Sequence, residues 1–227
     1  MSTYFISDIH GEYELFIKLL KTINFSSTDI LFILGDIIDK GKDSIKLLEY
    51  ISKQNNMFAI MGNHECSFAE YVNGIIDSTP NHNYDLIIQK IQKYFPEGSG
   101  YLSPENISYL VNLPFYIETE NFICIHAGLE IVDNKILPMS KQNYKYMIFD
   151  RNFKNKEFEP ISKPILLGHT PCFYDQLNGK FIKHLKPNHD PHNFSSYSKI
   201  RLDTGVNYTQ MLGVLKMEDM QEIYVKK

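Results

Sequence analysis

Five short apolar runs, each ending abruptly in a cluster of polar residues, constrain the fold of this chain most strongly. The runs cover residues 4–6, 30–34, 57–61, 122–125 and 165–167. Continuous runs of this length, rich in β-branched and aromatic residues, are typical of strands buried on both faces. The sequence therefore predicts five buried strands, with polar side chains at the carboxyl end of each.

The two segments between the first three runs have helical periodicity. Apolar residues recur every four positions in the first segment and every three in the second: Leu15, Leu19 and Ile23, then Ile45, Leu48 and Ile51. This alternation of strand and helix predicts a parallel sheet with right-handed crossover connections.

The rest of the chain divides into a helical part and a strand-rich part. We expect residues 66–113 to be wholly helical, with one apolar face and a capped helix start at Ser103-Pro104. The residues of that face are Tyr84, Ile87, Ile91 and Phe95. Further strands are expected at 180–185, 199–203, 210–217 and 222–226, with a polar surface loop at 186–198. This order predicts an α/β fold, with two β-sheets in a sandwich flanked by helices, in a single domain over residues 1–227.

Composition and charge exclude several classes of protein. Hydrophobic residues make up 43% of the chain, enough for a large core, and the net charge of −4 argues against a general nucleic-acid binder. No window reaches the ~18 apolar residues of a membrane helix, and the first residues lack the features of a signal peptide. The three cysteines form no CxxC pair. We therefore expect a cytoplasmic, monomeric protein without nucleic-acid or membrane partners.

The polar clusters at the strand ends supply candidate metal ligands. Ligands of parallel sheets bind at the carboxyl ends of strands, so these side chains should converge. They are Asp8, His10, Asp36, Asn63, His126 and His169. Carboxylate, amide and imidazole donors suit Mn, Fe or Zn better than Cu(I) or Ca. Each residue alone has a simpler explanation, such as an Asp N-cap or a hydrogen-bonded His, but five clusters at five strand ends favour a metal centre.

Five motifs resemble, in order, the signature of the calcineurin-like metallophosphoesterases. They are Asp8-Ile9-His10-Gly11, Gly35-Asp36-Ile37-Ile38-Asp39-Lys40-Gly41, Gly62-Asn63-His64-Glu65, His126-Ala127-Gly128-Leu129 and Gly168-His169-Thr170-Pro171. The resemblance is closest to the branch of PPP-type serine/threonine protein phosphatases and symmetrical diadenosine tetraphosphatases. Leu202-Asp203-Thr204-Gly205 looks like the C-terminal motif of that branch.

The resemblance implies a dinuclear metal centre, with manganese as the foremost expectation and iron or zinc as alternatives. One ion would be held by Asp8, His10 and His169, the other by Asn63 and His126, with Asp36 bridging. A hydroxide between the two ions would attack phosphorus, because paired cations lower the pKa of bound water.

The resemblance also implies roles for four further residues. His64 would protonate the leaving oxygen, oriented by Asp39, while Arg151 and Lys40 would bind the phosphate. Lys40 stands where the family usually has arginine, so it keeps the charge but lacks the bidentate fork. The tryptophan usual near Arg151 is absent, because the chain contains no tryptophan.

Three functions are compatible with these residues. The main hypothesis is a phosphomonoesterase of the serine/threonine protein phosphatase type, acting on phosphorylated proteins or small phosphate esters. The alternative is a symmetrical diadenosine tetraphosphatase, and the third is an inert binding module on this fold. A dinucleotide would need surfaces for its bases, but the aromatic residues between Glu65 and Phe122 are predicted to belong to the core. These are Tyr71, Tyr84, Tyr94, Phe95 and Tyr101. The negative net charge also disfavours a tetraphosphate, unless lysines such as Lys40 gather at the site.

Some reactive residues lie outside the motifs. His184, His189 and His192 cluster in the polar loop without regular ligand spacing, so a second metal site is disfavoured. Cys66 is interpreted as a small residue that opens a helix rather than a redox switch. Arg201 fits a substrate contact and a structural salt bridge equally well.

Overall fold

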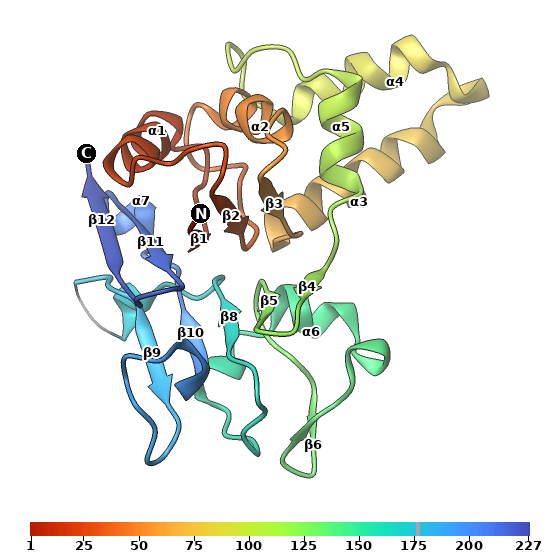
Figure 1. Ribbon diagram of the computed structural model, residues 1–227. Helices are drawn as coiled ribbons and strands as arrows, with labels where there is room; N and C mark the ends of the chain where they lie inside the picture. Colours follow the sequence, from red (N-terminus) through yellow and green to blue (C-terminus); the bar gives the residue numbers. More distant parts are fainter. Residues whose placement is uncertain (176–177) are drawn as a thin grey trace.

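The computed structural model describes residues 1–175 and 178–227, which form two five-stranded sheets packed face to face between helices (Figure 1). The strand order is β12-β11-β1-β2-β3 in the first sheet and β4-β5-β8-β10-β9 in the second. The predicted α/β sandwich is confirmed.

The first sheet contains the three parallel strands predicted near the N-terminus. These are β1 (Thr3–Ile6), β2 (Ile30–Ile33) and β3 (Met57–Ala59). The helices α1 (Tyr13–Thr22) and α2 (Ser44–Ser52) connect them, and their apolar stripes are buried. Two antiparallel strands, β11 (Met211–Lys216) and β12 (Glu222–Lys226), complete the sheet beside β1.

The second sheet places two more of the predicted runs side by side. β5 (Ile123–Ile125) is parallel to β8 (Ile165–Leu167), which is parallel to β10 (Tyr197–Arg201). The antiparallel strands β4 (Tyr116–Glu118) and β9 (Ile182–Leu185) lie at its edges. The prediction missed β4 and the small hairpin of β6 (Ile131–Val132) and β7 (Lys135–Ile136), since two or three residues give no periodic pattern.

The core between the two sheets explains why most predicted strands are buried on both faces. Phe5 of β1 meets Phe122, just before β5, edge to face at a centroid distance of 4.9 Å, and Leu166 of β8 packs in the same cluster. The outer faces are covered in turn by helices and loops. The prediction is wrong for β3, where Phe58 is 45% exposed, because β3 is the edge strand of its sheet.

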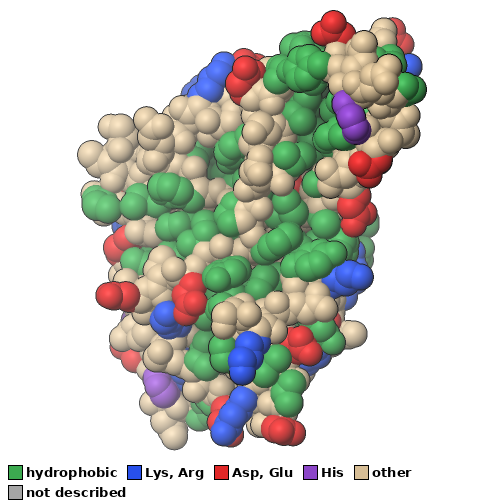
Figure 2. Space-filling view, turned by 90° about the vertical axis from the view of Figure 1, so that its right-hand side faces the viewer, with side chains coloured by type: hydrophobic (Ala, Val, Ile, Leu, Met, Phe, Trp, Pro, Cys, Tyr) green, Lys and Arg blue, Asp and Glu red, His purple; other side chains and the backbone are tan. Residues whose placement is uncertain are grey.

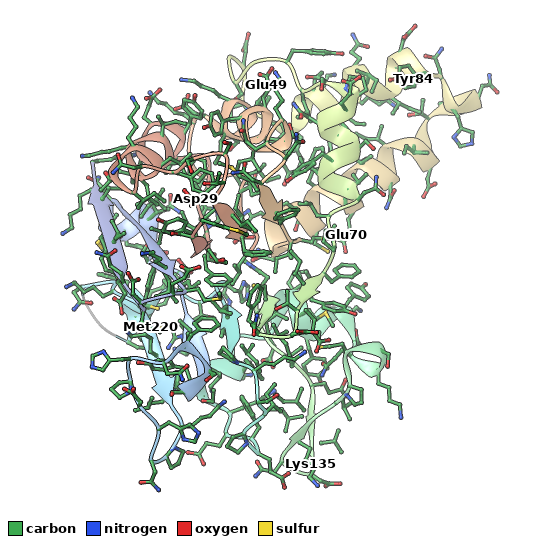
Figure 3. The ribbon with its side chains drawn as sticks, viewed as in Figure 1. Asp29, Glu49, Glu70, Tyr84, Lys135 and Met220 are labelled. Carbon is green, nitrogen blue, oxygen red and sulfur yellow. The ribbon has the colours of Figure 1, made fainter. Side chains whose placement is uncertain are left out.

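Residues 66–113 form a helical extension of the molecule (Figure 1). Its helices are α3 (Asn63–Ser78), α4 (Tyr84–Ile91) and α5 (Pro104–Val111), and the Ser103 hydroxyl caps α5 as predicted. The expectation of a wholly helical segment is wrong for 95–103, where glycines with positive φ interrupt it. Tyr84 is also not part of the buried face, since it projects from α4 into solvent (Figure 3).

The C-terminal half contains two short helices, α6 (Tyr144–Phe149) and α7 (Val206–Thr209). The polar loop predicted at 186–198 is irregular except for one 3₁₀ turn, and β10 begins at its end.

Hydrophobic side chains gather across the middle of the face toward which α3 and α6 project (Figure 2). A groove of about 620 Å³ lies between β3, α5 and β4, and Phe58, Pro114 and Ile117 are among its lining residues.

Within residues 1–175 and 178–227, no helix combines the length and the hydrophobicity needed to cross a bilayer.

Candidate metal centre

The six predicted metal ligands all converge where five strands end. Asp8 and His10 follow β1, and Asp36 follows β2. Asn63 is the first residue of α3, directly after β3, while His126 and His169 follow β5 and β8. Four of these loops are joined in pairs by backbone hydrogen bonds, from Asp8 N to Gly35 O and from Gly168 N to His126 O among others.

Asp36 lies at the middle of this group. One carboxylate oxygen is 3.5 Å from His10 Nε2, and the other is 3.4 Å from His126 Nε2. Two sets of possible ligands have their donor atoms within 4.8 Å of one another, and Asp36 belongs to both. The sets are His10, Asp36 and His64, and Asp8, Asp36 and His126. This position is compatible with a carboxylate that bridges two cations.

Asn63 and His169 close the other side of the group. Asn63 Oδ1 is 2.8 Å from His169 Nδ1 and 3.1 Å from His126 Nε2. The backbone N–H of His169 donates to Asp8 Oδ2 at 3.0 Å. His169 belongs to neither of the two sets, so the division of the six ligands between two ions stays a prediction.

Burial disfavours the ionised forms of the carboxyl groups of the site. Burial and the neighbouring charge of Asp36 raise the pKa of Asp8 to about 7. Burial raises the pKa of Asp36 to about 6 and that of Asp203 well above its usual range. A positive charge inserted among these groups would stabilise their ionised forms.

His10 and His169 are held neutral, and burial also lowers the pKa of His126. Burial, with the nearby charge of Lys40, lowers the pKa of His10 to about 2. Burial and His126 lower the pKa of His169 to about 2, and its Nε2 is buried without a hydrogen-bond partner among the described residues. Neutral imidazoles with available lone pairs beside carboxylates are the donor set that divalent transition metals bind, so these residues fit a metal centre.

The backbone of the site is strained in a way that the motifs alone do not reveal. Asp8, His10, Asp36 and His169 all have positive φ, between 48° and 65°. Left-handed conformations cost non-glycine residues roughly 1–2 kcal/mol each and cluster at functional sites. These strained turns sharply redirect the chain at each strand end, where the candidate ligands lie.

Glu65 holds the loop after β2 and was not assigned a role from the sequence. Its fully buried carboxylate accepts hydrogen bonds from the backbone N–H groups of Asp36, Ile37, Ile38 and Gly62, at 2.8–3.1 Å. A Cβ at Gly62 would collide with Asp36, so glycine permits this close approach. The bond from Gly62 N–H to Glu65 is the glutamate half of a capping box, because Gly62 has no side chain to cap α3.

His64 and Asp39 form the pair that the resemblance implied. Asp39 Oδ2 is 2.7 Å from His64 Nδ1, and the opposite ring nitrogen, Nε2, is 3.9 Å from Asp36. Burial lowers the pKa of His64, but the hydrogen bond to Asp39 and the charge of Asp36 outweigh it and raise the pKa overall. Tyr94, expected only in the core, also donates its hydroxyl to Asp39 at 3.1 Å.

Lys40 and Arg151 lie at a cavity of about 90 Å³ that adjoins the candidate ligands. Lys40 Nζ is 2.8 Å from His10 Nε2, and Arg151 Nη1 donates to the carbonyl of His169 at 3.5 Å. The side chains of Lys40 and Arg151 therefore approach the candidate metal ligands from the side of the cavity. Asp203, Tyr174 and Tyr208 line the same cavity and were missed by the sequence analysis, apart from the motif that contains Asp203.

The residues outside the motifs have structural explanations. Arg201 is buried, pairs with Asp175 at 2.7 Å and donates to the carbonyl of Thr170, which is a structural salt bridge. Cys66 is buried in the first turn of α3, and burial raises the pKa of its thiol. His184 lies in β9 rather than in the loop, and none of His184, His189 and His192 belongs to a metal-ligand set among the described residues.

Comparison with known proteins identifies the family. The family model described as calcineurin-like phosphoesterase matches residues 1–208. The chain belongs to the calcineurin-like phosphoesterases. The resemblance inferred from the five motifs is therefore confirmed.

Curated relatives of this phosphoesterase are named symmetrical bis(5'-nucleosyl)-tetraphosphatases. The protein of Wigglesworthia glossinidia brevipalpis is 31% identical over 183 residues, which cover 72% of this chain and 61% of that protein. A protein of Buchnera aphidicola is 40% identical over 87 residues, or 37% of this chain and 32% of that protein. The matches thus span less than two thirds of these relatives' own length.

Solved structures of phosphoesterases share the fold. A crystal structure provisionally named a diadenosine tetraphosphatase has a TM-score of 0.69 at 18% identity, covering 99% of this chain and 92% of that one. A serine/threonine phosphatase of Saccharomyces cerevisiae has a TM-score of 0.56 at 13% identity, covering 100% and 80%. At these identities the likeness concerns the fold alone.

Proposed function

We propose that this phosphoesterase hydrolyses dinucleoside polyphosphates at a dinuclear metal centre. The observation that carries the proposal is the metal-ligand cluster beside a small cavity that also presents Lys40, Arg151, Tyr174 and Tyr208. The names of the curated relatives support it. They favour the alternative from the sequence analysis over the main hypothesis, a serine/threonine protein phosphatase, for which nothing here gives specific support.

Six residues would hold two divalent transition-metal ions, and manganese is the ion we expect. They are Asp8, His10, Asp36, Asn63, His126 and His169, with Asp36 as the bridging group. When bound, the ions supply a water of lowered pKa as the nucleophile and neutralise charge on the phosphoryl oxygens.

His64 provides the proton for the leaving group in this proposal. Asp39 fixes His64 through Nδ1 at 2.7 Å, so that Nε2 is the nitrogen that can donate. The raised pKa of His64 keeps more of the ring protonated near neutral pH than an exposed histidine would be. The proton passes from Nε2 to the leaving oxygen, here the terminal oxygen of a nucleoside diphosphate.

Lys40 and Arg151 supply positive charge at the site, although the negative net charge of the chain disfavours a tetraphosphate substrate. Both line the cavity beside the centre, so positive charge is focused where a polyphosphate would bind. Arg151 can bind phosphoryl oxygens with its planar fork, whereas Lys40 acts as a point charge.

The test compares kcat/KM on diadenosine tetraphosphate and on a phosphothreonine peptide, with Mn²⁺ present. We expect the dinucleotide to be preferred by a hundredfold or more, about 2.7 kcal/mol in transition-state stabilisation. Chelation should abolish hydrolysis, and re-addition of Mn²⁺ should restore it. A preference for the peptide would favour a protein phosphatase, and no turnover of either substrate with Mn, Fe or Zn would favour an inert binding module.

A further inference from the structure

Three aromatic residues form a cluster at the rim of the cavity. Phe173 stacks on Tyr208 with an interplanar angle of 3° and a centroid distance of 5.8 Å. Tyr174 is 5.7 Å from Tyr208 and donates its hydroxyl to that of Tyr208 at 3.0 Å. Yet Tyr174 is 56% exposed and Tyr208 is 59% exposed. The two tyrosines thus keep much of their rings open to a ligand.

The local backbone explains why the two segments meet. The backbone N–H of Cys172 donates to the carbonyl of Asp203 at 2.8 Å. Gly205 has a φ of 69°, and a Cβ there would lie 3.1 Å from Pro171 and 3.4 Å from Phe173. Glycine therefore allows the segment before α7 to pack tightly against the segment after β8. Tyr174 lies at the end of a 3₁₀ turn and Tyr208 lies within α7.

The size of the cavity determines which part of a substrate can enter it. Its volume of about 90 Å³ is far below the ~300–1,000 Å³ of pockets that enclose a whole small ligand. A phosphate group can enter and meet Lys40 and Arg151, but a nucleoside cannot follow it. The nucleoside of a bound nucleotide must therefore lie at the rim, where Tyr174 and Tyr208 are exposed.

We propose that Tyr174 and Tyr208, supported by Phe173, are the surface on which a nucleobase of the substrate stacks. This inference rests on the proposed function and identifies the residues that would select a nucleotide over other phosphate esters. Stacking of a base on an aromatic side chain is a recurrent and strong contribution to nucleotide binding. The tyrosine rings lie beside the phosphate-binding cations, as a ligand with an anionic end and an aromatic end requires.

The aromatic residues of the helical extension do not offer such a surface. Tyr94 packs against Phe68, Tyr71 and Phe95 at centroid distances of 5.0–5.2 Å, and Phe95 is buried. Tyr84 is exposed on α4 (Figure 3), and Tyr101 is 64% exposed, so the prediction that they belong to the core is wrong. Neither of them lines the cavity.

The first test uses the absence of tryptophan from the chain. A Tyr208→Trp variant carries a single tryptophan that keeps an aromatic ring at the rim. With Mn²⁺ at a fixed concentration, adenosine monophosphate should quench its fluorescence saturably, whereas ribose 5-phosphate should not. Tyr84→Trp is the matched control and should respond to neither compound. Equal responses of the Tyr208→Trp variant to the two compounds would overturn the inference.

The second test separates stacking from structural damage. A Tyr174→Leu/Tyr208→Leu variant should raise the KM for diadenosine tetraphosphate at least tenfold, with a smaller change in kcat. Tyr208→Phe keeps the ring and should retain a KM within about twofold of the unaltered protein. An unchanged KM in the double variant, or a loss confined to kcat, would contradict a stacking role.

The tests distinguish failure of this inference from failure of the proposed function. Selective quenching by adenosine monophosphate without hydrolysis of the dinucleotide would support the stacking surface and refute the proposed substrate. If the double-leucine variant hydrolyses the dinucleotide with an unchanged KM, the proposed substrate would be supported and the stacking surface refuted. Quenching by phosphotyrosine at tenfold lower concentration than by adenosine monophosphate would overturn the assignment to a nucleobase.

Discussion

Replacement of Glu65 by glutamine should destabilise the protein and weaken its metal centre together. Each carboxylate oxygen of Glu65 accepts two backbone hydrogen bonds, Oε1 from Ile37 and Ile38, and Oε2 from Asp36 and Gly62. The amide oxygen of glutamine can replace only one of these oxygens. Its NH₂ group then faces two N–H donors, so two buried hydrogen bonds are lost.

The magnitude follows from those two bonds. Hydrogen bonds to a charged group are worth about 1.5–3 kcal/mol each, which gives a loss of about 3–6 kcal/mol. Part of the loss is returned, because burial of the Glu65 carboxylate is itself unfavourable and raises its pKa. We expect a net decrease of about 3 kcal/mol in the free energy of unfolding, a large share of the ~5–15 kcal/mol typical of a domain.

Urea denaturation and Mn²⁺ titration measure the two effects. Because Glu65 fixes the backbone of Asp36, the affinity for Mn²⁺ should fall roughly 10–100-fold, as for other residues that orient metal ligands. Glu70→Gln is the matched control, since Glu70 projects from the same helix into solvent (Figure 3). A Glu65→Gln variant with unfolding free energy within 1 kcal/mol of the unaltered protein would refute this reasoning.

Three further predictions concern His64, Lys40 and His184. His64→Asn should lower kcat by about 10²–10⁴-fold for substrates with poor leaving groups and by less for an activated aryl phosphate, while the metal content stays near normal. Equal losses of kcat on both substrates would mean that His64 is not the acid. Lys40→Arg should leave kcat/KM unchanged or improve it, because the fork restores bidentate phosphate contacts; a severe loss would show that the site requires an ammonium. Burial and the charges of Lys199 and Arg201 lower the pKa of His184 to about 4. The unfolded chain therefore binds more protons between about pH 4 and pH 6.5, and the free energy of unfolding should fall as the pH falls through this window. His184→Gln should show a flatter pH dependence in urea titrations, and an identical slope would contradict the assignment.

The convergence of the candidate metal ligands could be predicted because each one follows a strand that the sequence marks clearly. Residues 4–6 and 30–34 are apolar enough to predict buried strands, and Asp8 and Asp36 each follow such a run after one intervening residue. Parallel strands bring such positions to one edge of a sheet, whatever the details of the loops. What this geometry cannot give is the division of ligands between ions, since that depends on the side-chain distances around Asp36.

Contacts between distant elements were harder to predict. Tyr94 lies 55 residues after Asp39 and reaches it only because the helical extension folds back over the loop after β2. The helical spacing of Tyr94 and its neighbours predicted a core residue. The ring of Tyr94 does pack against other aromatic rings, but the spacing did not predict the hydrogen bond of its hydroxyl. Periodicity reports which face of a helix is buried, but not which polar group a buried side chain meets.

The same limit explains why the sequence analysis did not single out Tyr174 and Tyr208. The helical extension contains several tyrosines at helical spacing, whereas Tyr174 and Tyr208 lie 34 residues apart in two short turns, a 3₁₀ turn and α7. No local pattern joins them; they meet because β8 and β10 are neighbours in one sheet, so that the loops after both strands leave from the same edge. The rule that brings the candidate metal ligands together therefore also brings the two tyrosines to the cavity. Exposed aromatic residues in loops that follow adjacent parallel strands are accordingly the first positions to examine for substrate selection in this chain.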